Sequence, residues 1–180
     1  NYGNKHHTLL SRRFDRDVNG CRKHFASAMT LLGLTDGCNA QSGNGYLDIV
    51  DFIVAQCCDT QKNLNELFRR VAFNIAIGNS DDHFRNHGFL LTKQGWTLSP
   101  AYDMNPTNDN HLSLLINSCT CEASLEILQD SAGEYMIERD KAKTIITEVT
   151  DAIRNWHNVA LRYGATKHEI YLFAPIFNKH

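Results

Sequence analysis

The sequence predicts an α+β domain that is predominantly helical, with a single β-hairpin set between the helices. Two observations support this fold class. Apolar residues recur at steps of three and four over several long segments, a pattern typical of amphipathic helices. Residues 88–92 and 95–99 form two short β-prone runs separated by a gap of two residues, and this arrangement predicts a hairpin.

Size and composition fit one globular domain. The chain has 180 residues, of which 42% are hydrophobic and 21% charged, and this length allows one substantial core rather than two. A formal net charge of −2 gives no electrostatic reason to expect direct nucleic-acid binding. Neither a transmembrane stretch nor a signal peptide is visible in the sequence, so we expect a cytoplasmic protein without a membrane partner.

The six cysteines do not form the pattern of a disulfide framework. Cys57 and Cys58 are adjacent, and Cys119 and Cys121 are one residue apart, which favours a reduced, cytosolic compartment. The second pair could contribute to a metal site, but no further pair stands at zinc-finger spacing. We therefore interpret the cysteines as small, half-buried hydrophobic residues.

Before residue 60 the predicted elements are a strand, a helix, a loop rich in Gly, Asn and Ser, and a second helix, at residues 9–15, 22–32, 36–45 and 48–56. The apolar positions of the two helices recur at helical spacing, and they are Phe25, Met29 and Leu32 in the first and Val50, Ile53 and Val54 in the second. Gly33 is expected to end the first helix.

Beyond residue 60, four helices are predicted around the hairpin, at residues 62–77, 122–129, 140–163 and 167–173. Gly78 is expected to end the first of them. The 140–163 helix has the strongest periodic pattern, formed by Ala142, Ile145, Val149, Ile153, Trp156, Ala160 and Tyr163. We expect one shared core built from Phe25, Leu67, Val71, Ile145, Val149, Ile153 and Trp156.

Residues 77–103 concentrate polar side chains on both sides of the predicted hairpin. Asp81 and Asn86 form a D-x-x-x-x-N pattern, and Asp103 follows the hairpin. Protein kinases use this order: the first aspartate contacts the substrate hydroxyl, and the asparagine and the later aspartate hold Mg²⁺. Magnesium prefers hard oxygen ligands, and a folded hairpin would bring Asn86 and Asp103 to one ion.

Two other interpretations remain open at this point. These polar residues could only cap local turns, and the HRD and DFG contexts of protein kinases are absent. His83 and His87 stand four residues apart, a spacing that a zinc hydrolase would use on a helix. Gly78 and Gly88 disfavour a helix at this place, so zinc is the weaker interpretation.

Three segments appear in a family-specific order: RFDR at residues 13–16, FNIAIGNSDDHFRNHGFL at residues 73–90, and WTLSPAYD at residues 96–103. Together they resemble the C-terminal domain of HipA-type kinases, the serine/threonine kinase toxins of bacterial toxin–antitoxin systems. The resemblance extends over nearly the whole chain. It implies that residues 1–180 form a protein-kinase-like C-lobe whose β-hairpin carries the catalytic and metal loop, with ATP and Mg²⁺ as cofactors.

The resemblance also implies roles for residues of the loop and the hairpin. Asp81 corresponds to the catalytic aspartate, and Asn86 and Asp103 correspond to the magnesium ligands. His83 lies two residues after Asp81, where many protein kinases place a lysine that contacts phosphate. A phosphate contact and a packing role within the loop are both open for His83.

A nucleotide-binding hinge is implied near the start of the chain. The backbone groups of Arg12 and Phe14 are expected to meet the adenine, and Asp15 is expected to reach the ribose. Arg12 stands where relatives often carry glutamate, which a contact made through the backbone should tolerate.

The family's phosphate-covering loop and ATP-contacting lysine have no counterpart in these 180 residues, because no G-x-G-x-x-G pattern occurs. Since the chain does not begin with methionine, we expect that an N-terminal kinase lobe is supplied by the same protein or by a separate chain. The resemblance further implies a HipB-like DNA-binding antitoxin as partner and a protein substrate, which in relatives is an aminoacyl-tRNA synthetase. The alternative is a non-catalytic kinase-fold module that binds an antitoxin; retention of Asp81, Asn86 and Asp103 favours the enzyme.

Overall fold

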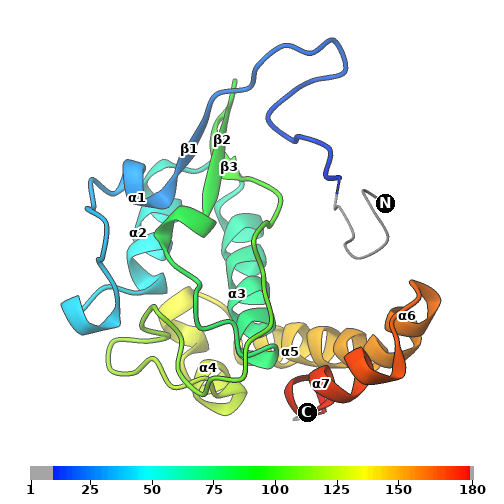
Figure 1. Ribbon diagram of the computed structural model, residues 1–180. Coiled ribbons are helices and arrows are strands. Elements are labelled where there is room, and N and C mark those ends of the chain that lie inside the picture. Colours follow the sequence, from blue (N-terminus) through cyan, green and yellow to red (C-terminus); the bar gives the residue numbers. More distant parts are fainter. Residues whose placement is uncertain (1–9, 179–180) are drawn as a thin grey trace.

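The structure is a computed structural model that describes residues 10–178. It combines many helices with one small antiparallel sheet (Figure 1), as the sequence predicts. The elements in chain order are β1 (Phe25–Ser27), α1 (Ala28–Leu31), the 3-10 helix η1 (Ala40–Ser42), α2 (Tyr46–Gln56), α3 (Thr60–Ala76), η2 (Phe84–Asn86), β2 (Gly88–Thr92), β3 (Gly95–Leu98), α4 (Leu125–Asp130), η3 (Ala132–Tyr135), α5 (Arg139–Arg154), α6 (Trp156–Arg162) and α7 (Lys167–Phe177).

The predicted hairpin is confirmed. Strands β2 and β3 pair antiparallel, with Leu91 opposite Trp96 and Thr92 opposite Gly95. Gly95 has a φ of 131°, a backbone angle that residues other than glycine rarely adopt. The order of the sheet is β1-β2-β3, so β2 is its central strand.

The predictions for the segment before the first loop are wrong. Residues 10–15 form no strand, while residue 9 lies outside the described residues. Within residues 22–32 only Ala28–Leu31 is α-helical, because Phe25–Ser27 pairs with β2 instead. Pairing with the edge of the hairpin outweighs the local helical periodicity, and it leaves Phe25 38% exposed, outside the expected core.

Helix α3 runs through the middle of the molecule and packs against α2 and α5 (Figure 1). The apolar residues predicted for it are all buried: Leu64, Leu67, Phe68, Val71 and Ile75. Gly78 follows the helix with a φ of 62°, and a Cβ at this position would lie 2.6 Å from the Thr107 carbonyl oxygen. Only glycine fits this turn, so the chain leaves α3 sharply and enters the loop before β2.

The single helix predicted for residues 140–163 is two helices. Helix α5 ends at Arg154, and α6 begins at Trp156. The apolar residues of the predicted periodic pattern are buried as far as Ile153, namely Ala142, Ile145, Val149 and Ile153. After the break, the apolar residues of this pattern no longer face the core. Trp156 is only half-buried and Tyr163 is 83% exposed.

The change of direction after α5 is stabilised by contacts with α7. The Trp156 ring stacks on Phe177, with ring centroids 5.0 Å apart, and its Nε1 donates to Asn178 Oδ1 at 3.0 Å. The stack covers one face of the ring, and the hydrogen bond satisfies the indole N–H, both outside the central core. The expectation that Trp156 belongs to the core is therefore wrong.

The remaining helices exist where the sequence predicts them, with shifted ends. Helix α2 begins at Tyr46, where the Asp48 carboxylate accepts a hydrogen bond from the Gly45 amide at 2.8 Å. Val54 is 46% exposed, which corrects its assignment to the apolar face. Helix α7 continues through Pro175 to Phe177. No helix among residues 10–178 is long and apolar enough to cross a membrane.

Candidate active site

The loop between α3 and β2 carries the first two predicted site residues. Asp81 is exposed, whereas Asn86 is buried at the end of η2. The Asn86 Nδ2 group donates a hydrogen bond to the Asp81 carbonyl at 3.1 Å, so the two residues are in direct contact. Within residues 10–178 the Asn86 Oδ1 atom has no hydrogen-bond partner, and it is left free to act as an oxygen ligand.

Asp103 lies at the end of the segment that follows β3. It is exposed, and its carboxylate accepts a hydrogen bond from Asn105 Nδ2 at 2.9 Å. Its φ of 57° is left-handed, a conformation that costs a non-glycine residue energy and that is often found at functional sites.

Tyr102 joins the segment of Asp103 to the loop of Asn86. Its hydroxyl donates to the Arg85 carbonyl at 2.6 Å, so the residues preceding Asp103 and Asn86 are in contact. Burial raises the pKa of Tyr102 to about 12; the nearby Arg70 opposes this, and Asp103 adds to it. The segments on either side of the hairpin are thus in contact through Tyr102 and Arg85, whereas a meeting of Asn86 and Asp103 at one ion stays a prediction.

Arg70 of α3 also binds the segment between β3 and Asp103. It is 5% exposed, and its Nη2 donates to the Ser99 carbonyl at 2.5 Å while its Nε pairs with Glu66 at 3.0 Å. A buried guanidinium bound in this way fixes the backbone where it leaves β3. Sequence reasoning missed this residue, because nothing in the α3 periodicity distinguishes Arg70 from a solvated arginine.

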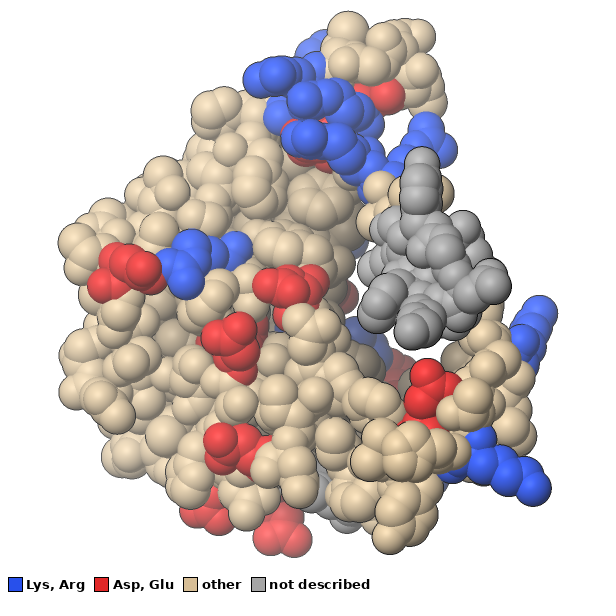
Figure 2. All heavy atoms as spheres, viewed as in Figure 1, with Lys and Arg blue, Asp and Glu red and all other residues tan. Residues whose placement is uncertain are grey.

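The predicted nucleotide hinge lies beside this segment. The Phe14 ring stacks on Tyr102 and contacts Phe25, with centroid distances of 5.8 and 5.7 Å. Arg12 and Phe14 both line a cleft of about 510 Å³. Figure 2 shows Lys and Arg side chains gathered at this end of the molecule, where residues 10–23 lie.

Asp15 is not free in the structure. Its carboxylate pairs with Arg13 at 2.6 Å and with Arg16 at 3.0 Å. The hydrogen bond from Arg13 lowers the pKa of Asp15 to about 2. A contact between Asp15 and a ribose would therefore have to share the carboxylate with two arginines.

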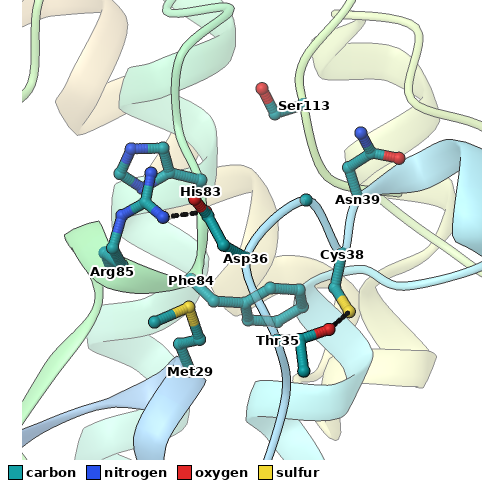
Figure 3. Close-up of a pocket in the computed structure, with 10 residues that line it drawn as sticks. Met29, Thr35, Asp36, Cys38, Asn39, His83, Phe84, Arg85 and Ser113 are labelled. Atoms are coloured by element: carbon teal, nitrogen blue, oxygen red, sulfur yellow. Dashed lines mark hydrogen bonds and ion pairs between the residues drawn. The ribbon is translucent and has the colours of Figure 1, made fainter.

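His83 lines a small pocket between the loop and residues 35–39, with a volume of about 160 Å³ (Figure 3). Arg85 and Asp36 form an ion pair at this pocket, and the Arg85 hydrogen bond lowers the pKa of Asp36. The Nδ1 atom of His83 is buried and has no partner among residues 10–178. The pocket is lined by apolar residues such as Met29 and Phe84 as well as by polar ones, and the contacts of His83 fit a phosphate role and a packing role equally.

The feature that sequence reasoning missed is a buried network around Asp82. Asp82 is 2% exposed, and its Oδ2 atom accepts hydrogen bonds from Tyr46 Oη at 2.5 Å, Asn74 Nδ2 at 2.5 Å and His87 Nε2 at 2.9 Å. Burial by itself raises the pKa of the Asp82 carboxyl. The charge and hydrogen bond of His87 and the hydrogen bond of Tyr46 outweigh burial, so the pKa lies below its ordinary value. The sequence carries no signal that separates Asp82 from Asp81, because the partners Tyr46 and Asn74 lie in other elements of the chain.

The contacts of the histidines and cysteines do not support zinc. His87 Nε2 is occupied by Asp82, and residues 10–178 contain no group of three or more His, Cys, Asp or Glu side chains placed to hold a metal ion. The six cysteines are free, and burial raises the pKa of Cys57 to about 12. Asn86 and Asp103 each keep oxygen atoms of the kind that magnesium prefers, although their side chains bond to different partners, the Asp81 carbonyl and Asn105.

Comparisons with known proteins agree with the sequence motifs. The model of the HipA-like C-terminal domain family matches residues 1–157. A chain of a solved structure, described as the Shewanella oneidensis MR-1 toxin–antitoxin system HipA, HipB and its operator DNA complex, has a similar fold with a TM-score of 0.75 at 18% identity. That similarity covers 92% of this chain and 45% of the Shewanella chain.

A Haemophilus influenzae Rd protein, whose name assigns it only provisionally to the kinases, is 28% identical over 105 residues. These residues are 55% of this chain and 31% of the Haemophilus protein. The chain thus spans less than half the length of either relative. Its fold, its three motifs and the family match lead to one conclusion: the chain belongs to the HipA-like C-terminal domain family.

Proposed function

We propose that this chain is the catalytic half of an ATP-dependent serine/threonine protein kinase of a toxin–antitoxin system. The observation that carries the proposal is the pair of hydrogen bonds that join the site segments. Asn86 donates to the Asp81 carbonyl, and Tyr102 donates to the Arg85 carbonyl. A catalytic aspartate and two metal ligands must face one bound nucleotide, and these contacts bring their segments together.

In the proposed reaction, the exposed Asp81 orients the hydroxyl of the substrate and accepts its proton. Asn86 Oδ1 and the Asp103 carboxylate would hold Mg²⁺, which when bound neutralises charge on the phosphates. Positioning and charge stabilisation carry most of the catalysis in phosphoryl transfer. The protein therefore needs well-placed oxygen atoms rather than a nucleophile of its own.

ATP would lie between this chain and the N-terminal lobe of the longer protein or of a separate chain. The stacked Phe14 and the backbone at Arg12 are suited to an adenine, because they border the cleft next to Tyr102. The phosphate-covering loop and its lysine would come from that lobe, since the 180 residues contain no G-x-G-x-x-G pattern. His83 is a candidate for a phosphate contact.

We propose a HipB-like DNA-binding antitoxin as partner, because the structural relative comes from a complex of HipA, HipB and operator DNA. The protein substrate would belong to the class that the family resemblance implies, the aminoacyl-tRNA synthetases. A non-catalytic module that only binds the antitoxin would not need an unpartnered Asn86 oxygen beside an exposed Asp81. This arrangement favours the enzyme.

Transfer of labelled phosphate from ATP to protein, in the full-length protein with Mg²⁺, tests the proposal. Asp81→Asn should lower the transfer rate by more than about 10²-fold, since orientation and proton acceptance are both lost. Asp51→Asn makes the same chemical change on the exposed face of α2 and should leave the rate unchanged. Equal rates for the two variants, or no transfer by the unmutated protein, would refute the assignment.

A further inference from the structure

Asp81 and Asp82 are neighbours with opposite environments. Asp81 is exposed at the loop surface, whereas Asp82 is buried beneath it. A buried carboxylate is retained only where hydrogen bonds replace its lost hydration. The three partners of Asp82 therefore have to stay in place for the loop to keep its conformation.

Those partners come from three separate parts of the fold. Tyr46 is the first residue of α2, Asn74 lies in the last turn of α3, and His87 is the residue that leads into β2. All three donate to the same oxygen atom, Oδ2. The two helices and the far end of the loop thus converge on one charged atom, which makes each of these hydrogen bonds stronger than a neutral one.

Further contacts extend the network on both sides. The Asn74 side chain also accepts from Asn79 Nδ2 at 3.1 Å, at the start of the loop. The His87 ring meets the Tyr46 ring edge-on at 5.6 Å, and the His87 carbonyl accepts from the Ala28 amide at 2.7 Å. Both ends of the loop are consequently attached to the helical core.

We propose that Asp82 is the positioning residue of the catalytic loop. Asp82 directly follows Asp81, and its partner His87 directly follows Asn86. The hydrogen bond between Asp82 and His87 therefore sets the distance between the proposed catalytic aspartate and the proposed magnesium ligand. It also turns Asn86 so that Nδ2 meets the Asp81 carbonyl and Oδ1 remains available. The kinetic part of this inference rests on the proposed function, whereas the structural part does not.

The first test measures amide hydrogen exchange in the full-length protein and its Asp82→Asn variant. An amide oxygen accepts less strongly than a carboxylate oxygen shared by three donors, so the loop should open more often. Exchange at the Asn86 and Ala28 amides, which donate to His83 and His87 carbonyls, should rise roughly tenfold or more. Amides in α5 should keep their exchange rates, because the network does not reach that helix.

The second test is kinetic. In Asp82→Asn the kcat for phosphate transfer should fall about 10- to 100-fold, the usual effect of losing a residue that orients catalytic groups. The KM for ATP should rise by less than it does in Asn86→Ala, because Asn86 is displaced rather than removed and Asp103 and the adenine-side residues stay in place. Tyr46→Phe removes one donor of three and should show a smaller loss in the same direction.

Ile145→Val is the control for stability alone, since Ile145 is buried in α5. It should lower the melting temperature without changing kcat. Unchanged exchange at Asn86 and Ala28 in both Asp82→Asn and Tyr46→Phe would overturn the inference, as would a kcat within threefold of the unmutated protein. If Asp82→Asn does not fold, Tyr46→Phe decides. Absence of transfer by the unmutated protein would count against the proposed function only, and the exchange measurement would still decide the positioning role.

Discussion

Replacing Trp156 by alanine tests the break between α5 and α6. One continuous helix would place Trp156 in the core beside Ile153, where its truncation would cost about 3–5 kcal/mol. In the structure the ring is half-buried and stacks on Phe177 at an interplanar angle of 20°. These two arrangements predict different losses of unfolding free energy.

The expected loss is the sum of three contributions. Stacking on Phe177 contributes ~1 kcal/mol beyond the buried area, and the surface hydrogen bond to Asn178 contributes ~0.5 kcal/mol. The buried half of the ring adds ~1 kcal/mol. Trp156→Ala should therefore lower the free energy of unfolding by about 2–2.5 kcal/mol.

Phe68→Ala is the reference for a residue of the central core. Phe68 is fully buried in α3 and meets Tyr135 edge-on at 5.3 Å, so its truncation should cost about 3–5 kcal/mol. Urea unfolding of both variants measures the two losses, provided that the slope with denaturant stays constant.

A double-mutant cycle adds a second criterion. Trp156→Ala and Phe177→Ala should be non-additive by about 1 kcal/mol, because each removes one half of the same stacked pair. A loss for Trp156→Ala as large as that for Phe68→Ala, with additive effects of the Trp156 and Phe177 changes, would refute the break and restore the continuous helix.

Three further predictions concern the site. Asn86→Ala and Asp103→Asn should each weaken MgATP binding to the full-length protein about 10- to 100-fold, whereas Asp81→Asn should leave the Kd within about threefold; equal losses in calorimetric titrations of all three would contradict the assigned roles. Arg70→Met should cost about 2–3 kcal/mol in urea unfolding, because it leaves the Ser99 carbonyl and Glu66 without their charged donor, while Lys62→Met on the exposed face of α3 should change stability by less than about 0.5 kcal/mol. The 180-residue chain alone should transfer phosphate at least about 10²-fold more slowly than the full-length protein, since nothing in it covers the phosphates; robust Mg²⁺-dependent transfer that is lost on Asp81→Asn would show that the chain suffices by itself.

Local patterns predicted those parts of the fold that local interactions determine. The α3 periodicity and its glycine stop are properties of one segment, and so is the two-residue gap of the hairpin. Strand β1 was mistaken for helix because its partner, β2, lies more than 60 residues further along the chain. The break at Asn155 was missed for a similar reason, since the Phe177 ring that receives Trp156 belongs to another helix.

The candidate site divides in the same way. The spacing of Asp81, Asn86 and Asp103 is visible in the sequence, because kinases place these residue types around one hairpin. Asp15 forms ion pairs with Arg13 and Arg16, all within four residues of the chain. Sequence spacing alone did not predict that these pairs would occupy the carboxylate expected to contact the ribose. Arg70 could not be identified, because its acceptor, the Ser99 carbonyl, is 29 residues away and belongs to the backbone.

The pair Asp81–Asp82 shows where a motif stops being informative. Both residues are aspartates in the same turn, so composition and spacing cannot tell which of them is catalytic. What separates them is a tyrosine 36 residues earlier in the chain and an asparagine in the preceding helix, which together with His87 bind one carboxylate inside the fold. The other carboxylate is thereby left at the surface with no competing partner beneath the loop. The burial of Asp82 is thus a physical reason for choosing Asp81 as the residue that meets the substrate, and it is independent of any resemblance to a kinase.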